Sequence, residues 1–289
     1  MPKKNRKLAI NLSIMIHQKF SFELHDSYFY GQYWHTKKIK AVVVLVHGMG
    51  EHSSRYTDFV IPTLTENGFG VISFDQFGHG NTTGKRGHCP NFTALLESVS
   101  YIVSKAEVVF GEKKPIFLYG HSMGGNVAIN YVLREEHFLK GIIATSPFLK
   151  LAFKPPAIKL FFGRILQSIA PSITMENGLD ANDISRDPIE VQKYINDPLI
   201  HNQISPNYSL TIMKTGKWAL ENAASLKTPM LLLHGTGDKI IDYKGSQDFA
   251  QKSTFANLKL YEGGYHELHN DLCKEEVMND VVNWIHSQL

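Results

Sequence analysis

A serine lies between two glycines in the pentapeptide GHSMG, residues 120–124. An apolar run, PIFLY, precedes it and a helical pattern, NVAINYVLREE, follows it. This strand-to-helix context is the one that the G-x-S-x-G motif requires, because the glycines allow a sharp turn that displays the serine at the end of the strand. The pattern predicts that Ser122 is a nucleophile for acyl transfer; the alternative is an ordinary glycine-rich turn.

A serine becomes nucleophilic when a histidine accepts its proton and a carboxylate orients that histidine. In the fold that carries this motif, the chain order is serine, acid, histidine. Asp238 follows the apolar run MLLL through HGTG, and His266 follows LKLY through EGG, so we expect both in loops at the carboxyl ends of strands. The alternative base is His269, otherwise a pocket or solvent residue, and the alternative role for Asp238 is capping.

Acyl transfer also needs hydrogen-bond donors for the oxyanion that forms on the carbonyl. The segment VHGMG, residues 46–50, follows the apolar run AVVVL, as the HG-type loop does in this fold. We therefore predict that the backbone N–H groups of Met49 and Met123 form the oxyanion hole.

Short apolar runs alternate with segments of helical spacing, which predicts a mostly parallel sheet with helices on both faces. The runs occupy residues 41–46, 70–74, 116–119, 141–145, 230–233 and 258–261. Before them, residues 10–24 alternate between apolar and polar, and a turn at Asp26–Ser27 leads into YFYGQYW, which predicts antiparallel strands.

Residues 150–225 interrupt this alternation and contain no strand-like run. An amphipathic helix is expected there between Pro155–Pro156 and Pro171, because apolar residues recur at positions 158, 161, 162, 165 and 169. A loop rich in Asp, Asn and Pro connects it to a second candidate helix, SLTIMKTGKWALENAASL. We expect an α/β core made of residues 1–149 and 226–289, with residues 150–225 as a helical cap.

The composition excludes several classes of protein. Lys and Arg number 30 against 27 Asp and Glu, and four of the basic residues cluster at positions 3, 4, 6 and 7. The remaining chain is nearly neutral, which argues against a nucleic-acid groove, and the basic tip is either a solvated tail or a contact for an anionic membrane. Cys89 and Cys273 fit neither a disulfide framework nor a zinc site, so we expect no metal and no cofactor.

The motifs resemble those of the monoglyceride lipase and lysophospholipase group of α/β-hydrolases, also labelled serine aminopeptidase S33. The resemblance runs from about residue 20 to the end, and its specific segments are HGMGEHSSRY, FDQFGHGNTTGKRGH, GHSMGG, DPL, LLLHGTGDKI and YEGGYHELHND. It implies the α/β-hydrolase fold, the triad Ser122, Asp238 and His266, the oxyanion donors Met49 and Met123, and the cap.

The resemblance also implies a small polar pocket for glycerol, with Glu51, Arg55, Tyr194 and His269 at or near the matching positions. Each of these residues also has a structural alternative. Glu51 and Arg55 are four residues apart, which suits a structural ion pair, and Tyr194 could pack within the cap. The strand-like residues 8–19 precede the usual start of the family. They are an extra sheet edge, an oligomer contact or a membrane contact.

We therefore expect a cytoplasmic serine ester hydrolase that cleaves monoacylglycerols. The alternatives are a lysophospholipase, a small-ester carboxylesterase, a peptidase and a non-catalytic binding protein of the same fold. No apolar run approaches the roughly 18 to 20 residues of a membrane span. Peripheral membrane contact is an option through the cap helix, where Lys154, Lys159 and Arg164 flank Phe161 and Phe162, with plain cap packing as the alternative.

Overall fold

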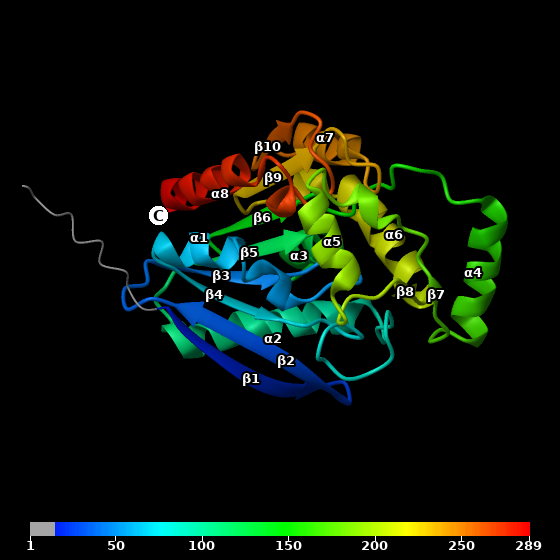
Figure 1. Ribbon diagram of the computed structural model, residues 1–289, viewed down its shortest axis with the longest axis horizontal. Coiled ribbons are helices and arrows are strands. Elements are labelled where there is room, and N and C mark those ends of the chain that lie inside the picture. Colours follow the sequence, from blue (N-terminus) through cyan, green and yellow to red (C-terminus); the bar gives the residue numbers. More distant parts are fainter. Residues whose placement is uncertain (1–14) are drawn as a thin grey trace, which may run out of the picture.

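An eight-stranded, mostly parallel sheet forms the centre of the computed structural model, which describes residues 15–289 (Figure 1). The strand order is β1-β2-β4-β3-β5-β6-β9-β10, and only β2 runs antiparallel to its neighbours. The strands are β1 (Ile16–Leu24), β2 (Ser27–His35), β3 (Ala41–Val46), β4 (Phe69–Phe74), β5 (Ile116–His121), β6 (Gly141–Thr145), β9 (Met230–Gly235) and β10 (Ala256–Tyr261). All six predicted apolar strands are confirmed.

The first strand forms one edge of the sheet, paired with β2 along its whole length. This confirms the predicted antiparallel pair and the turn that joins its strands, which lies at His25 and Asp26, one residue earlier than expected. Residues 8–14 of the expected N-terminal strand lie outside the described residues.

Helices cover both faces of the sheet because the side chains of each strand alternate between the faces. Val42 and Val44 pack into a core beneath one set of helices, whereas Val43 and Leu45 pack into a second core on the other face. The first core holds α2 (Phe92–Phe110), α3 (Met123–Arg134), α6 (Pro206–Glu221) and α7 (Tyr243–Lys252), and the second holds α1 (Val60–Glu66) and α8 (Lys274–Gln288).

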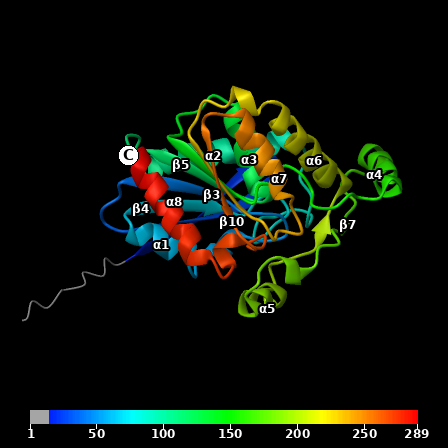
Figure 2. The ribbon, with the colours of Figure 1, turned by 90° about the horizontal axis from the view of Figure 1, so that it is seen from above.

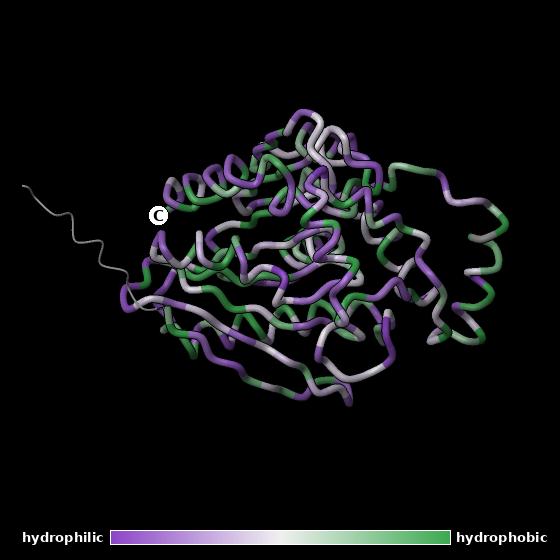
Figure 3. The backbone as a smooth tube through the Cα atoms, in the orientation of Figure 1, coloured by the Kyte–Doolittle hydropathy of each residue, from purple (hydrophilic) through white to green (hydrophobic). Residues whose placement is uncertain are grey.

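Residues 150–225 contain three helices and a short strand pair at one end of the molecule. The predicted first helix is confirmed as α4 (Ala157–Ile169), which lies at the periphery in both ribbon views and carries long hydrophobic stretches (Figures 1, 2 and 3). The second begins at Pro206, where the Ser205 side chain accepts the Tyr208 N–H. This second helix, α6, also packs on α3 of the core. The division of the chain at residues 150 and 225 stays a prediction.

The segment between these helices differs from the expected loop. It contains α5 (Pro188–Asn196), which begins where the Asp187 side chain accepts the Ile189 N–H and Pro188 occupies the first turn. The same Asp and Pro residues that indicate turns also start helices, which is why composition alone missed it. A two-residue antiparallel pair, β7 (Met175–Glu176) with β8 (Gln203–Ile204), also corrects the expectation that the segment has no strand.

Short 3-10 helices complete the chain between these elements. They are η1 (Ser53–Tyr56), η2 (Ala181–Asp183), η3 (Ala223–Ser225) and η4 (Leu268–Asn270). Among residues 15–289, no helix combines the length and the apolar character needed to cross a membrane.

The turn from β5 into α3 is tightly packed. Ser122 has a positive φ of 53°, a strained conformation for a residue with a side chain. A Cβ atom on Gly120 would lie 2.4 Å from the Gly124 carbonyl oxygen, and one on Gly124 would lie 2.2 Å from the Val46 carbonyl oxygen. Both glycines of the motif are therefore required by close backbone contacts, and the turn packs directly on the end of β3.

We expect Gly124→Ala to destabilise the fold by about 3 kcal/mol or more, because neither the helix nor the end of β3 has room for the methyl group. Thermal unfolding should show a midpoint lower by at least about 5 °C. Gly163→Ala in α4 is the matched control: its Cβ would lie 3.7 Å from Leu210, an ordinary contact, so helix propensity should leave stability unchanged or slightly raised. Equal midpoints for the two variants would contradict the assignment of this close contact.

Candidate active site

Three residues from separate loops form a hydrogen-bonded chain at the carboxyl edge of the sheet. His266 Nε2 lies 2.9 Å from Ser122 Oγ, and His266 Nδ1 lies 2.7 Å from Asp238 Oδ2. Ser122 comes from the turn after β5, Asp238 from the loop after β9 and His266 from the loop after β10. All three are buried. The structure thus brings together the three residues that the sequence analysis selected.

The charges of the hydrogen-bonded residues shift their pKa values in the direction that proton transfer requires. Burial by itself would raise the pKa of Asp238, but the charge of His266 and hydrogen bonds from His234 and His266 hold this pKa well below its ordinary value. Burial would lower the pKa of His266, and the Asp238 carboxylate more than offsets it, so that the pKa of His266 is raised. Asp238 therefore stays ionised, and His266 is suited to accept a proton from Ser122.

The Asp238 carboxylate is held by more than His266. Its Oδ1 atom accepts the backbone N–H groups of Ile240 and Ile241, at 2.8 and 2.9 Å. Its Oδ2 atom also lies 3.1 Å from Nε2 of the buried His234. Sequence reasoning missed His234 because it stands inside an apolar strand, where its only signal is a polar residue in a run of leucines.

The two predicted oxyanion donors lie beside the nucleophile. Met49 and Met123 both line the cavity that contains Ser122. Met123 is the first residue of α3, so its backbone N–H has no acceptor within the helix. The loop that carries Met49 is fixed by a 2.6 Å hydrogen bond from the Gly48 N–H to Glu51 Oε1. That the N–H groups of Met49 and Met123 bind the oxyanion stays a prediction.

A buried ion cluster connects the loop of Met49 to the loop of His266. The Arg55 guanidinium donates to both carboxylate oxygens of Glu267, at 2.6 and 2.8 Å, and to Glu51 at 3.0 Å. The Tyr56 hydroxyl donates to the other Glu51 oxygen at 2.9 Å. Burial would raise the pKa of Glu267, but Arg55 lowers it to about 2, so this carboxylate is ionised at neutral pH. Sequence reasoning missed Glu267, whose only signal is its position next to His266.

The structure distributes the four expected pocket residues between the cavity and its surroundings. Glu51 and Tyr194 line the cavity, whereas Arg55 and His269 are not among its lining residues. Arg55 lies over the Tyr194 ring, 4.9 Å from the ring centroid. It also forms the ion pair with Glu51 that their spacing in the sequence allows. Contact of these four residues with a substrate stays a prediction.

His269 is fully buried, so its alternative assignment as a solvent residue is wrong. Its ring stacks on Tyr56 at 4.8 Å and lies edge-on to His121, also at 4.8 Å. Burial lowers the pKa of His269 and of His121, so both rings are neutral neighbours of the triad. Because its ring nitrogens bond to neither Ser122 nor Asp238, His269 does not replace His266 as the base.

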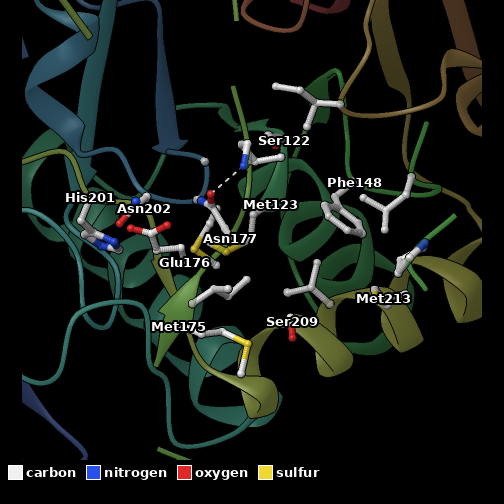
Figure 4. Close-up of a pocket in the computed structure, with 18 of the residues that line it drawn as sticks. Ser122, Met123, Phe148, Met175, Glu176, Asn177, His201, Asn202, Ser209 and Met213 are labelled. Atoms are coloured by element: carbon white, nitrogen blue, oxygen red, sulfur yellow. Dashed lines mark hydrogen bonds between the residues drawn. The ribbon is translucent and has the colours of Figure 1, made fainter. Parts of the chain in front are cut away.

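The cavity around Ser122 has a volume of about 980 Å³ and lies between the core and residues 150–225. Figure 4 shows His201, Asn202 and Glu176 on one side of Ser122, and Phe148 and Met213 on the other. Five acidic residues line the cavity, and no Lys or Arg is among the lining residues whose side chains the structure describes. The five are Glu51, Glu176, Asp180, Asp197 and Glu267. The cavity therefore combines an apolar side with a polar side of negative charge.

The described part of the chain contains no group of three or more His, Cys, Asp or Glu side chains arranged to hold a metal ion. Cys89 and Cys273 are both free thiols. Burial raises the pKa of each, Cys273 to about 11, so neither is a reactive thiolate at neutral pH. Ser122 is thus the nucleophile that the geometry around the cavity favours.

Comparison with known proteins gives a consistent match over most of the chain. The family model described as serine aminopeptidase, S33, matches residues 37–273. An uncharacterized abhydrolase domain-containing protein from Dictyostelium discoideum is 38% identical over 88% of this chain, although the match spans only 27% of that longer protein. The monoacylglycerol lipase of Mycolicibacterium smegmatis is 32% identical over 86% of this chain and 89% of the relative.

Solved structures agree with the sequence comparison. The crystal structure of the Paleococcus ferrophilus monoacylglycerol lipase superposes with a TM-score of 0.81 at 32% identity, covering 96% of this chain and all of that chain. The match confirms the predicted α/β-hydrolase fold, with its mostly parallel sheet of eight strands flanked by helices.

We expect Arg55→Met to destabilise the protein by about 3 to 5 kcal/mol, because it leaves the buried carboxylates of Glu51 and Glu267 without their shared cation. Esterase activity should also fall by on the order of tenfold or more, since the loops of Met49 and His266 lose their connection. The matched control is Lys217→Met, which removes an exposed ion pair with Glu221 and should cost less than about 1 kcal/mol. Chemical denaturation and steady-state kinetics measure both effects, and an Arg55→Met protein as stable as the control would disprove the role of the cluster.

Proposed function

Because this chain belongs to the serine aminopeptidase S33 family and shares its fold with a solved monoacylglycerol lipase, we propose that it is a serine hydrolase that cleaves monoacylglycerols to fatty acid and glycerol. The observation that carries the proposal is the hydrogen-bonded chain of Ser122, His266 and Asp238 inside a large, partly apolar cavity. The likeness to two monoacylglycerol lipases, at 32% identity each, supports the choice of substrate.

The reaction proceeds in two acyl-transfer steps. Ser122 Oγ attacks the ester carbonyl while His266 Nε2 accepts its proton, and the N–H groups of Met49 and Met123 bind the oxyanion. The tetrahedral intermediate collapses, His266 returns the proton to the leaving glycerol oxygen, and the acyl group remains on Ser122. A water molecule, activated by His266, then releases the fatty acid and regenerates the serine.

The acyl chain would occupy the apolar side of the cavity. Each CH₂ group transferred from water to such a site contributes about 0.8 kcal/mol. The apolar lining comes from the core and from both α4 and α6, and includes Phe148, Leu160, Phe162, Leu166, Leu210 and Met213. A single-chain lipid therefore binds far more strongly here than a short ester, which disfavours the small-ester alternative.

The head group would face the polar side, near Glu51, Glu267 and Tyr194. Among residues 15–289, Arg55 is the only guanidinium bonded to the two glutamates, so their cluster keeps one net negative charge. With five acidic residues and no Lys or Arg among the described side chains of the lining, the cavity disfavours an anionic head group. An uncharged glycerol can donate its hydroxyl protons to these carboxylates, which favours monoacylglycerols over lysophospholipids.

Peripheral contact with a lipid surface would deliver such substrates. Several large apolar side chains of α4 face solvent: Ile158, Phe161, Phe162, Ile165 and Ile169 are each 39% or more exposed. This exposure favours lipid contact over plain packing of the cap. The helix carries basic Arg164 and no acidic residue, with Lys154 just before it, which suits an anionic bilayer; the side chain of Lys159 lies outside the described residues.

We expect the enzyme to prefer decanoylglycerol to the glycerol-phosphate ester of the same acid by on the order of 100-fold in kcat/KM, because the phosphate approaches like charges. Rates are compared below the concentration at which either lipid forms micelles. Ser122→Ala should retain the thermal unfolding midpoint, lose all turnover and lose labelling by a fluorophosphonate. Comparable rates on the two esters would refute the head-group argument, and turnover by Ser122→Ala would refute the nucleophile.

For the lipid surface, we expect the double variant Phe161→Ser and Ile169→Ser to bind vesicles of phosphatidylcholine and phosphatidylglycerol at least about tenfold more weakly, because each lost side chain removes roughly 1.5 kcal/mol or more of burial. Its activity on monomeric ester should be unchanged. The control is Phe138→Ser, which alters an equally apolar side chain that is 94% exposed and far from α4 in the sequence. Vesicle flotation gives the comparison, and equal binding by all three proteins would exclude contact through α4.

A further inference from the structure

A second buried histidine bonds to the acid of the triad. His234 lies in β9 and is fully buried. Its Nε2 atom lies 3.1 Å from Asp238 Oδ2 and 3.3 Å from the Ile241 carbonyl oxygen. Its Nδ1 atom lies 2.8 Å from the hydroxyl of Ser246, a fully buried residue of α7. Asp238 Oδ2 thus stands between two imidazoles, His234 and His266.

The partners of His234 determine where its proton lies. Both partners of Nε2, a carboxylate oxygen and a carbonyl oxygen, can only accept a hydrogen bond, so Nε2 must carry a proton. In the neutral ring Nδ1 is then an acceptor, and the Ser246 hydroxyl is the donor that faces it. A second positive charge on His234 would compete with the His266 imidazolium for the same carboxylate oxygen. The neutral Nε2–H tautomer is therefore the form that serves catalysis.

We infer that Ser246 and His234 are positioning residues, which hold the Asp238 carboxylate toward His266 through a hydrogen-bonded chain that runs from α7 to Ser122. The inference rests on the proposed triad. Ser246 fixes the tautomer of His234, His234 donates to Asp238 Oδ2, and the N–H groups of Ile240 and Ile241 hold Oδ1. With all four contacts made, the carboxylate has one orientation, and that orientation presents Oδ2 to His266.

The same contact tunes the basicity of His266. A carboxylate oxygen that accepts two N–H bonds shares its charge between them, so loss of the His234 donor strengthens the attraction of Asp238 for a protonated His266. Among the described residues, the other titratable groups that act on His266 are Glu51 and Glu267, the ring of His269, and the ring of His121, which lies tilted to it at 4.9 Å. None of these groups bonds to the His266 ring, whose two nitrogens contact Asp238 and Ser122.

The test compares His234→Leu, which removes both ring nitrogens, with His234→Gln, whose amide can still donate to Asp238. Ser246→Ala removes the tautomer-setting donor, and Ser98→Ala, another fully buried helical serine, bonded only to a carbonyl of its own helix, is the control. Each protein is assayed for kcat and KM on p-nitrophenyl butyrate across the pH range in which histidine titrates, for its rate of labelling by a fluorophosphonate, and for its thermal midpoint. Wild-type labelling by the fluorophosphonate tests the triad independently of the positioning residues.

We expect His234→Leu to lower kcat and the labelling rate by on the order of 10- to 100-fold with little change in KM, and to move the acid limb of kcat/KM to higher pH. His234→Gln should restore most of the rate, Ser246→Ala should show a smaller loss in the same direction, and Ser98→Ala none. A folded His234→Leu protein with wild-type kcat and an unmoved acid limb would overturn the inference. A Ser246→Ala protein with the same kcat, labelling rate and acid limb as Ser98→Ala would also overturn it. If His234→Leu fails to fold, this comparison of the two serine variants is the test. An unlabelled wild type would instead reject the triad itself.

Discussion

The site depends on the close approach of two backbone segments, the turn at Ser122 and the end of β3. With no Cβ on Gly124, α3 starts directly against the Val46 and His47 carbonyl oxygens. This contact holds the first N–H of α3 next to the loop that carries Met49, so that one steric fit sets both the strained serine and the two backbone N–H groups proposed as oxyanion donors. The positive φ of Ser122 persists because the surrounding core, buried on both faces of β5, leaves the turn no alternative.

Polar contacts then fix the loops that this backbone contact does not reach. Arg55 connects the loop after β3 to the loop after β10 through Glu51 and Glu267, and His234 connects β9 to Asp238. These side chains are buried, and each has a specific partner, so their desolvation is offset only in one arrangement. The molecule thus uses apolar packing to build the sheet and buried charge to set the relative positions of its loops.

The sequence was sufficient for the sheet and for the three residues that the structure brings into one hydrogen-bonded chain, because both follow from local patterns. Each buried strand is a short apolar run, and Ser122, Asp238 and His266 each stand just after one. It was not sufficient for Glu267, His234 or α5. The role of Glu267 comes from Arg55, 212 residues earlier in the sequence, and no spacing rule connects such a pair. The partners of His234 are nearer, with Asp238 four and Ser246 twelve residues later, but the contacts depend on how β9, its loop and α7 pack together. The α5 helix was hidden because its capping Asp and Pro are also turn residues.

The position of α4 separates the choice of substrate from the rate of ester cleavage. In a site built only from the core, the same residues would determine both. Among the described elements, this helix packs chiefly on α6, and it supplies part of the apolar lining of the cavity, whereas Ser122, Asp238 and His266 all come from the core. Substitutions in α4 can therefore change the length or polarity of the lipid that the cavity accepts while the geometry around Ser122 stays constant. Selection on which lipid enters is, in this architecture, largely independent of selection on how fast the ester bond is broken.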